Sequence, residues 1–152
     1  MEDSRKLLDH FYVCCNKMDG LYYLAARRLG VKENALVLLY TLNDGQPRSQ
    51  KQLSEELLIP KTTINTIVKE YMDAGYVTLV PANHSREKNI ALTPAGAAYA
   101  QEILEPVYRA EKEAMEQTLA EFSPEFMNAI EALTQNMAQA FQRTIFDRKE
   151  LE

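Results

Sequence analysis

Small polar and basic side chains recur on one face of the segment that begins at Pro60. Short hydroxyl and amide side chains can form hydrogen bonds with base edges, and lysines at either end of such a segment can bind phosphates. A helix here would pack its apolar face on the domain, leave the polar face for a major groove of DNA, and add N-terminal N–H groups that favour phosphate. The predicted contacts are Thr62, Thr63, Asn65 and Thr66 with bases, and Lys61 and Lys69 with phosphates.

A second set of cations lies in the polar stretch from Ala82 to Lys88. Residues 76–80 and 89–92 have strand propensity, so we expect a small hairpin with a charged tip. Arg86 and Lys88 would then reach the adjacent minor groove or its phosphates. Gln50 completes the predicted set of DNA contacts.

The elements that must position these residues can be located from their start and stop signals. Ser49 with Gln52 three residues later forms a capping box that opens a short helix ending near Leu57. The next helix runs from Pro60 to about Ala74, and Gly75 stops it. Helix, turn, helix and hairpin in this order are typical of a winged helix-turn-helix. One such feature alone would be ordinary solvated surface, but the ordered set favours DNA binding.

Long amphipathic helices flank this centre over residues 4–29, 94–121 and 124–146. Their apolar stripes exceed what the centre can cover, so we expect a second copy of the chain to pack against them. The predicted dimerisation residues are Leu7, Phe11, Phe126, Ile130, Phe141 and Ile145. The expected fold is mainly α with a small β-hairpin. Its parts are an N-terminal dimerisation helix (1–30), a DNA-binding winged helix (31–92) and C-terminal dimerisation helices (93–152).

Residues 31–96 resemble the MarR family of bacterial transcription regulators, and the flanking helices fit its architecture. The resemblance rests on residues 53–64 (LSEELLIPKTTI), 73–77 (DAGYV) and 86–96 (REKNIALTPAG). It implies a homodimer on a pseudo-palindromic operator and repression relieved by a small aromatic or lipophilic ligand or by oxidation. Two positions depart from the family pattern. His84 replaces the usual Asp near Arg86, and Leu58 stands where Gly is frequent, which costs strain if that residue is left-handed.

Composition excludes several other classes of protein. The net charge is −5, but residues 46–92 carry six basic and five acidic groups, while residues 93–152 carry five basic and eleven acidic groups. The longest uncharged apolar stretch is too short to cross a bilayer, and the mixed charge of residues 1–6 predicts no signal peptide, so we expect a cytoplasmic protein without membrane contact. His10 and His84 are not spaced as a pair of metal ligands would be, and no enzyme motif is present. We therefore expect no metal, no cofactor and no catalysis.

Three further interpretations stay open. Cys14 and Cys15 could sense oxidants near Tyr12, Tyr22 and Tyr23, or could simply be small apolar residues of the helix stripe. Tyrosines such as Tyr40, Tyr71 and Tyr76 could line a ligand cavity, although aromatic residues at helical spacing usually belong to the core. The modest charge of residues 46–92 also leaves room for a winged helix that binds only protein, without DNA.

Overall fold

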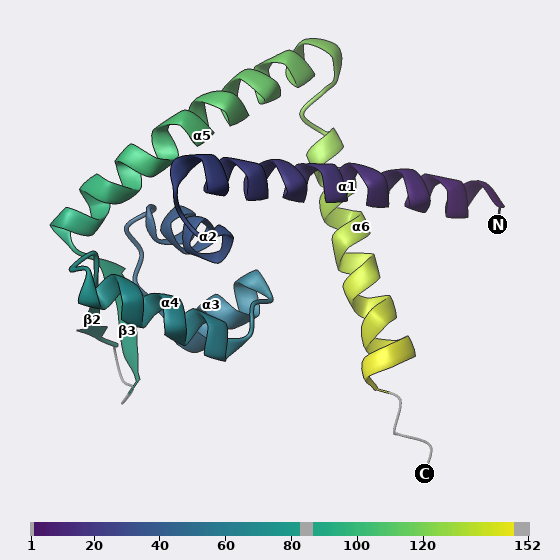
Figure 1. Ribbon diagram of the computed structural model, residues 1–152. Helices are drawn as coiled ribbons and strands as arrows, with labels where there is room; N and C mark the ends of the chain where they lie inside the picture. The colour runs from purple at the N-terminus through teal and green to yellow at the C-terminus, as the bar shows by residue number, and fades with distance from the viewer. Residues whose placement is uncertain (1, 83–86, 148–152) are drawn as a thin grey trace. The chain divides into compact units, whose positions relative to one another are not determined.

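The computed structural model describes residues 2–82 and 87–147, which are mostly helical with one small sheet (Figure 1). The chain divides into two compact units, and the boundary lies between Tyr108 and Arg109. The helices are α1 (Glu2–Leu29), α2 (Glu33–Leu42), α3 (Gln50–Leu57), α4 (Lys61–Asp73), α5 (Pro94–Glu121), α6 (Phe126–Phe141) and a π-helix, η1 (Gln142–Phe146). The strands are β1 (Arg48–Ser49), β2 (Val77–Pro81) and β3 (Lys88–Leu92).

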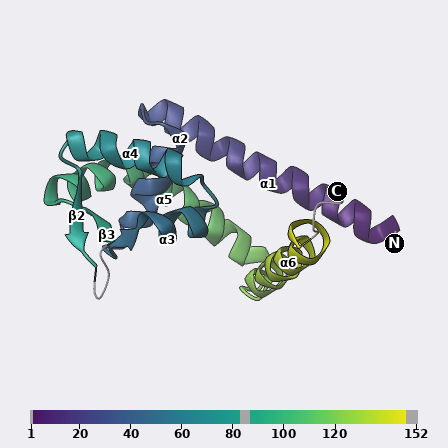
Figure 2. The ribbon, with the colours of Figure 1, turned by 90° about the horizontal axis from the view of Figure 1, so that it is seen from below.

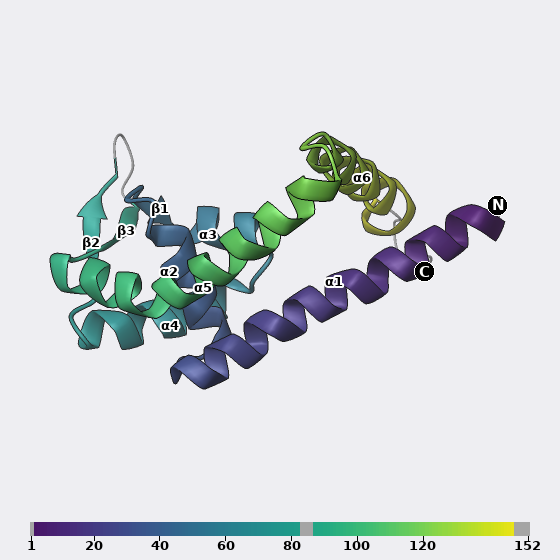
Figure 3. The same ribbon diagram turned by 90° about the horizontal axis from the view of Figure 1, so that it is seen from above.

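The predicted winged helix-turn-helix is confirmed, with one strand that the sequence did not reveal. The three strands form an antiparallel sheet in the order β1-β3-β2, with β3 at the centre (Figure 3). β1 pairs Arg48 with Ile90 and Ser49 with Asn89. Two residues of strand give almost no sequence pattern, and only the pairing with β3 defines them. β2 also extends one residue further than expected, through Pro81.

Two buried clusters hold the first unit together. One lies between α2, α3, α4 and the sheet, and its fully buried side chains include Leu38, Leu53, Ile64 and Ile90. The other joins the end of α1 to α2 and α5. Tyr71 and Leu92 pack against both clusters. α2 supplies buried residues to each of them, which is why its sequence is apolar on most sides.

The junction between the sheet and α5 depends on a very close approach of two backbone segments. The Thr93 amide donates to the Tyr76 carbonyl (3.0 Å), and the Thr93 hydroxyl donates to the Gly75 carbonyl (2.7 Å) while accepting from the Gly96 amide (2.9 Å). A Cβ on Gly96 would lie 1.8 Å from the Tyr76 carbonyl oxygen, so only glycine fits there. These contacts explain why Thr93 precedes α5 and why glycine occupies position 96.

The turn between α3 and α4 contains a strained residue. Leu58 has φ 52° and ψ 32°, the left-handed conformation that its position in the sequence led us to consider. Its side chain is 88% exposed, so no packing offsets the strain. Within the same turn, the Ser54 hydroxyl donates to the Ile59 carbonyl at 2.7 Å and fixes the path of the chain.

The outer helices contrast with this packed centre. α1 has Ala26 near its C-terminus as its buried residue, whereas Leu7, Tyr12, Met18 and Leu21 are exposed. In the second unit, the described residues of α6 and η1 include none that is buried. None of the helices, over the residues that the structure covers, has the length and apolarity to cross a membrane.

Candidate nucleic-acid interface

Helix α4 presents the predicted polar face. Ile64, Ile67 and Val68 are buried, which fixes the rotation of the helix about its axis. The consequence is that Lys61, Thr62, Asn65, Thr66 and Lys69 are exposed, whereas Thr63 is half-buried. The Thr66 hydroxyl donates to the Thr62 carbonyl at 3.0 Å, so its oxygen stays available as an acceptor. Pro60 is the N-cap, and the helix starts at Lys61, one residue later than predicted.

The first turn of α3 approaches α4 through a side-chain hydrogen bond. The Gln50 amide nitrogen donates to the Asn65 carbonyl oxygen at 3.2 Å. The predicted capping box sets the position of Gln50: the Gln52 amide donates to the Ser49 hydroxyl (3.1 Å) and the Ser49 amide to the Gln52 side chain (2.8 Å). Two residues that the sequence assigned separately to DNA contact are therefore joined.

A shallow hollow of about 240 Å³ lies where α3, α4 and the sheet meet. It is lined by Gln50, Lys51, Lys61, Leu79, Glu87 and Lys88. Three lysines from three different elements thus surround one concave surface, against a single carboxylate. Figure 2 shows the ribbons of these elements, α3, α4 and β3, in the same part of the first unit. Such a surface suits a phosphate or another small anion.

The structure assembles some predicted contacts and separates others. Gln50, Lys61 and Lys88 line the hollow, and Asn65 is bonded to Gln50. Lys69, two turns further along α4, does not line it. Arg86 and His84 lie outside the described residues, so the expected wing contact of Arg86 stays a prediction. Sequence analysis missed Lys51, whose exposed position in the first turn of α3 could have been inferred once the capping box was recognised.

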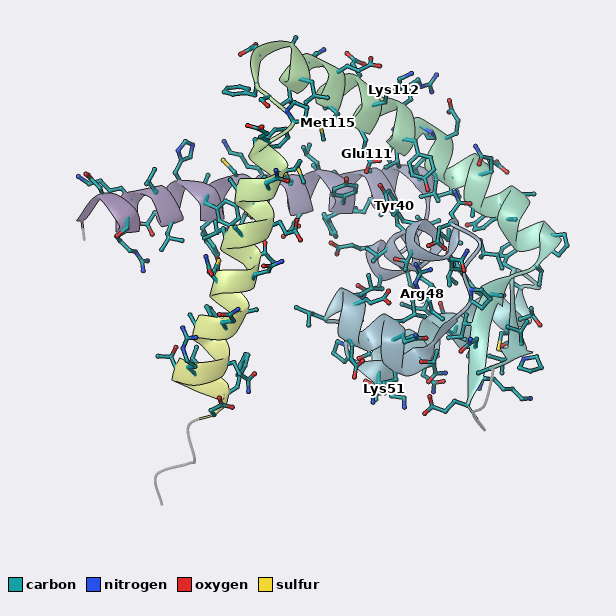
Figure 4. The ribbon with its side chains drawn as sticks, turned by 180° about the vertical axis from the view of Figure 1, so that it is seen from behind. Tyr40, Arg48, Lys51, Glu111, Lys112 and Met115 are labelled. Carbon is teal, nitrogen blue, oxygen red and sulfur yellow. The ribbon has the colours of Figure 1, made fainter. Side chains whose placement is uncertain are left out.

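Arg48 was also missed, and its side chain, labelled in Figure 4, joins α2, β1 and α3. Its guanidinium donates to the Thr41 carbonyl in α2 (2.8 Å), to both Asp44 carboxylate oxygens (2.6 and 2.9 Å) and to Glu56 in α3 (3.1 Å). The bond with Arg48, helped by the Gln46 amide, lowers the pKa of Asp44 to about 2. Asp44 raises the pKa of Arg48 in turn. The network joins β1 to the end of α2 and to the last turn of α3.

The tyrosines of the first unit form packed clusters. Tyr76 and Tyr99 stack with ring centroids 4.2 Å apart, and Tyr71 meets both rings edge-on at 6.0 and 6.2 Å. Burial of the Tyr71 hydroxyl raises its pKa, and the neighbouring Tyr99 raises it further. Tyr40 packs edge-on against Tyr108, and the Asn43 amide donates to the Tyr108 hydroxyl at 3.1 Å. Tyr71, Tyr99 and Tyr108 pack against the buried clusters, which favours a structural role for them, whereas Tyr40 is exposed.

The remaining predicted sites lie on the outer helices. Cys14 is exposed and Cys15 half-buried, with free thiols. Of the predicted dimerisation residues, Leu7, Ile130, Phe141 and Ile145 are exposed, and Phe11 and Phe126 are half-buried. Among residues 2–82 and 87–147, no cluster of His, Cys, Asp or Glu is arranged to hold a metal ion.

Comparison with known proteins finds a family match over part of the chain. Residues 29–87 match the family model described as MarR family. A comparison with curated protein sequences finds no match.

Solved structures show the same fold over nearly the whole chain. A MarR family regulator from Neisseria meningitidis has a TM-score of 0.73 and 22% identity, over 98% of this chain and all of that one. Overoxidized AbfR bound to DNA has a TM-score of 0.64 and 17% identity, over 92% and 96% of the two chains. Staphylococcus aureus MarR in complex with salicylate and kanamycin has a TM-score of 0.66 and 15% identity, over 93% of each chain. Residues 29–87 therefore match the MarR family model, and the solved structures share the winged helix-turn-helix fold of this chain.

Proposed function

We propose that the protein is a sequence-specific DNA-binding transcriptional regulator whose α4 enters the major groove. The observation that carries this proposal is the gathering of Gln50, Lys51, Lys61, Asn65 and Lys88 around one surface formed by α3, α4 and the sheet. Polar groups that can form hydrogen bonds with bases lie between cations that can bind phosphates, as an insertion into a groove requires. A protein of the same fold has been solved bound to DNA.

The active form in this proposal is a homodimer on a pseudo-palindromic operator. The apolar side chains left exposed on α1, and separately on η1, support it: Leu7 is 70% exposed and Ile145 is 56% exposed. A second copy would bury them. Two α4 helices related by a twofold axis would then contact half-sites about one turn of DNA apart.

We further propose that the protein is a cytoplasmic repressor and that a small aromatic or lipophilic ligand releases it from the operator. The support is the likeness to a relative solved with salicylate. Such a ligand would act by favouring a dimer spacing that does not match the half-sites.

The test is fluorescence anisotropy with duplexes tiled from the DNA that flanks the gene, across a salt titration. We expect one duplex to bind far more tightly than the rest, with an affinity that falls steeply as salt rises, because each phosphate contact releases counterions. The matched variants are Lys61→Gln, which should lower both affinity and salt slope, and Lys112→Gln on an exposed site of α5, which should leave both unchanged.

Weak binding to every duplex, with little dependence on salt, would overturn the proposal. The winged helix would then serve protein interaction. If peroxide releases the operator in the wild type but not in a chain with Cys14→Ser and Cys15→Ser, the thiols sense oxidants; release that persists in that chain excludes them.

A further inference from the structure

The hydrogen bond between Gln50 and Asn65 links a residue outside the recognition helix to the residue best placed for base contact. Asn65 lies one turn into α4 and is exposed, whereas Gln50 is the first residue of α3 and is half-buried. The bond spans 15 residues of sequence and joins two helices at 3.2 Å. The bond orients both amides relative to each other.

We propose that Gln50 is a specificity-determining positioning residue, which sets the orientation of the Asn65 amide and thereby the base that Asn65 contacts. This inference rests on the proposed function. Because the Gln50 nitrogen donates, the Asn65 oxygen turns toward α3 and the Asn65 nitrogen turns away from it. An amide nitrogen carries two N–H donors and no acceptor. Asn65 therefore offers donors to the groove.

Base edges in the major groove differ in the hydrogen-bond acceptors and donors that they offer. Guanine offers N7 and O6, thymine offers O4, and cytosine offers a donor at the same edge. An Asn65 that presents N–H groups favours a base with acceptors there and rejects cytosine. If the amide were turned over, its carbonyl oxygen would favour the amino groups of adenine or cytosine instead.

The backbone of Gln50 is fixed well enough to transmit this choice. The two residues of the capping box, Ser49 and Gln52, lie on either side of Gln50. Ser49 also pairs with Asn89 of β3, and Arg48 forms ion pairs with Asp44 and Glu56. In the free protein the Gln50–Asn65 bond faces water and contributes little to stability. Against DNA it loses that water, and in the lower dielectric a hydrogen bond between the two side chains becomes stronger.

The experiment measures base preference rather than affinity alone. A duplex selected by the wild-type protein from a randomised library is varied one base pair at a time, and binding of each duplex is measured for the full chain and its variants. Asn65→Ala identifies the base position that Asn65 contacts. We expect Gln50→Ala to reduce discrimination at that same position about fivefold, and the double variant to show no more loss than Asn65→Ala alone.

Gln50→Glu gives a sharper result than loss of preference. A carboxylate only accepts hydrogen bonds, so Asn65 must turn its nitrogen toward α3 and its oxygen toward the groove. The preferred base at the Asn65 position should change toward adenine or cytosine, while the added negative charge weakens binding to all duplexes alike. Lys51→Gln, at the next residue of α3, should also weaken all duplexes alike but leave the preference unchanged. Circular dichroism confirms that each variant is folded.

Two results would overturn the inference while leaving the proposed function intact. One is an unchanged preference in Gln50→Ala. The other is a loss of discrimination at a different base position that adds to the effect of Asn65→Ala. That result would mean that Gln50 itself contacts a base. Wild-type protein that binds DNA without any base preference would instead overturn the proposed function and, with it, this inference.

Discussion

The winged helix, from α2 to β3, and the outer helices α1 and α6 use apolar residues in opposite ways. In the winged helix, side chains such as Leu53 and Ile64 are fully buried, and helix ends and turns are closed by specific hydrogen bonds. In α1 most large apolar side chains are exposed, and α6 has no buried residue among those described. The winged helix therefore completes its core within one chain, whereas the outer helices leave large apolar side chains exposed.

The two glycines Gly96 and Gly20 test this contrast most strongly. Gly96→Ala places a Cβ against the Tyr76 carbonyl and should lower the free energy of unfolding by more than about 4 kcal/mol, because backbone cannot move away cheaply. Gly20→Ala in α1 meets nothing within 4 Å and should raise it by about 0.5–1 kcal/mol. Urea denaturation measures both. A destabilised Gly20→Ala would instead mean that another chain packs closely against that face of α1.

Alanine variants of one leucine from each region should affect different properties, the stability of the fold in one and self-association in the other. Leu53→Ala should lower the free energy of unfolding by about 2–5 kcal/mol, because Leu53 is fully buried. Leu7→Ala should leave the monomer's stability nearly unchanged but raise the dimer dissociation constant about tenfold or more, if each copy buries one leucine. Sedimentation equilibrium measures the second effect. An unchanged dissociation constant would remove Leu7 from the interface.

Leu58 offers a smaller and opposite effect inside the winged helix. Leu58→Gly should stabilise the fold by up to about 1 kcal/mol, because glycine adopts positive φ without strain and the lost side chain is exposed. Leu58→Ala keeps the strain and is the control, which should stay close to wild type. Thermal melts of both variants decide the point. Equal stability of all three chains would mean that the turn is not strained.

The smallest expected effect concerns Asp44 and its pH dependence. The folded pKa of Asp44, about 2, lies below its ordinary value of 3.8, so its ionised form favours folding. The resulting stability is present above about pH 4 and is lost as pH falls through the folded pKa. Asp44→Asn should thus be less stable than wild type at neutral pH, and the difference should shrink toward about pH 2. A difference that is independent of pH would refute the assignment to this carboxylate.

Local signals in the sequence predicted much of the fold. The Ser49 capping box and the stop at Gly75, which has φ 78°, depend on neighbouring residues only and were confirmed. The apolar spacing of Ile64, Ile67 and Val68 likewise fixed the outward face of α4, because helical periodicity decides which side chains are buried. The exposed positions of Asn65 and Lys69 followed directly from it.

The features that the sequence did not reveal depend on how separate elements pack. β1 exists through its pairing with β3, and Arg48 gains its role from Thr41, Asp44 and Glu56 together. Lys51 was passed over because a single lysine on a short helix is indistinguishable from ordinary surface until the hollow beside it is known.

Because periodicity and caps are local, the order of the elements, the polar face of α4 and the apolar stripes of the outer helices follow from the residues alone. The bond from Gln50 to Asn65, the hollow between three lysines and the contact of Gly96 with the Tyr76 carbonyl depend on tertiary packing. Those contacts arise when separate elements pack, and distances of a few ångströms between them are not encoded in residue spacing.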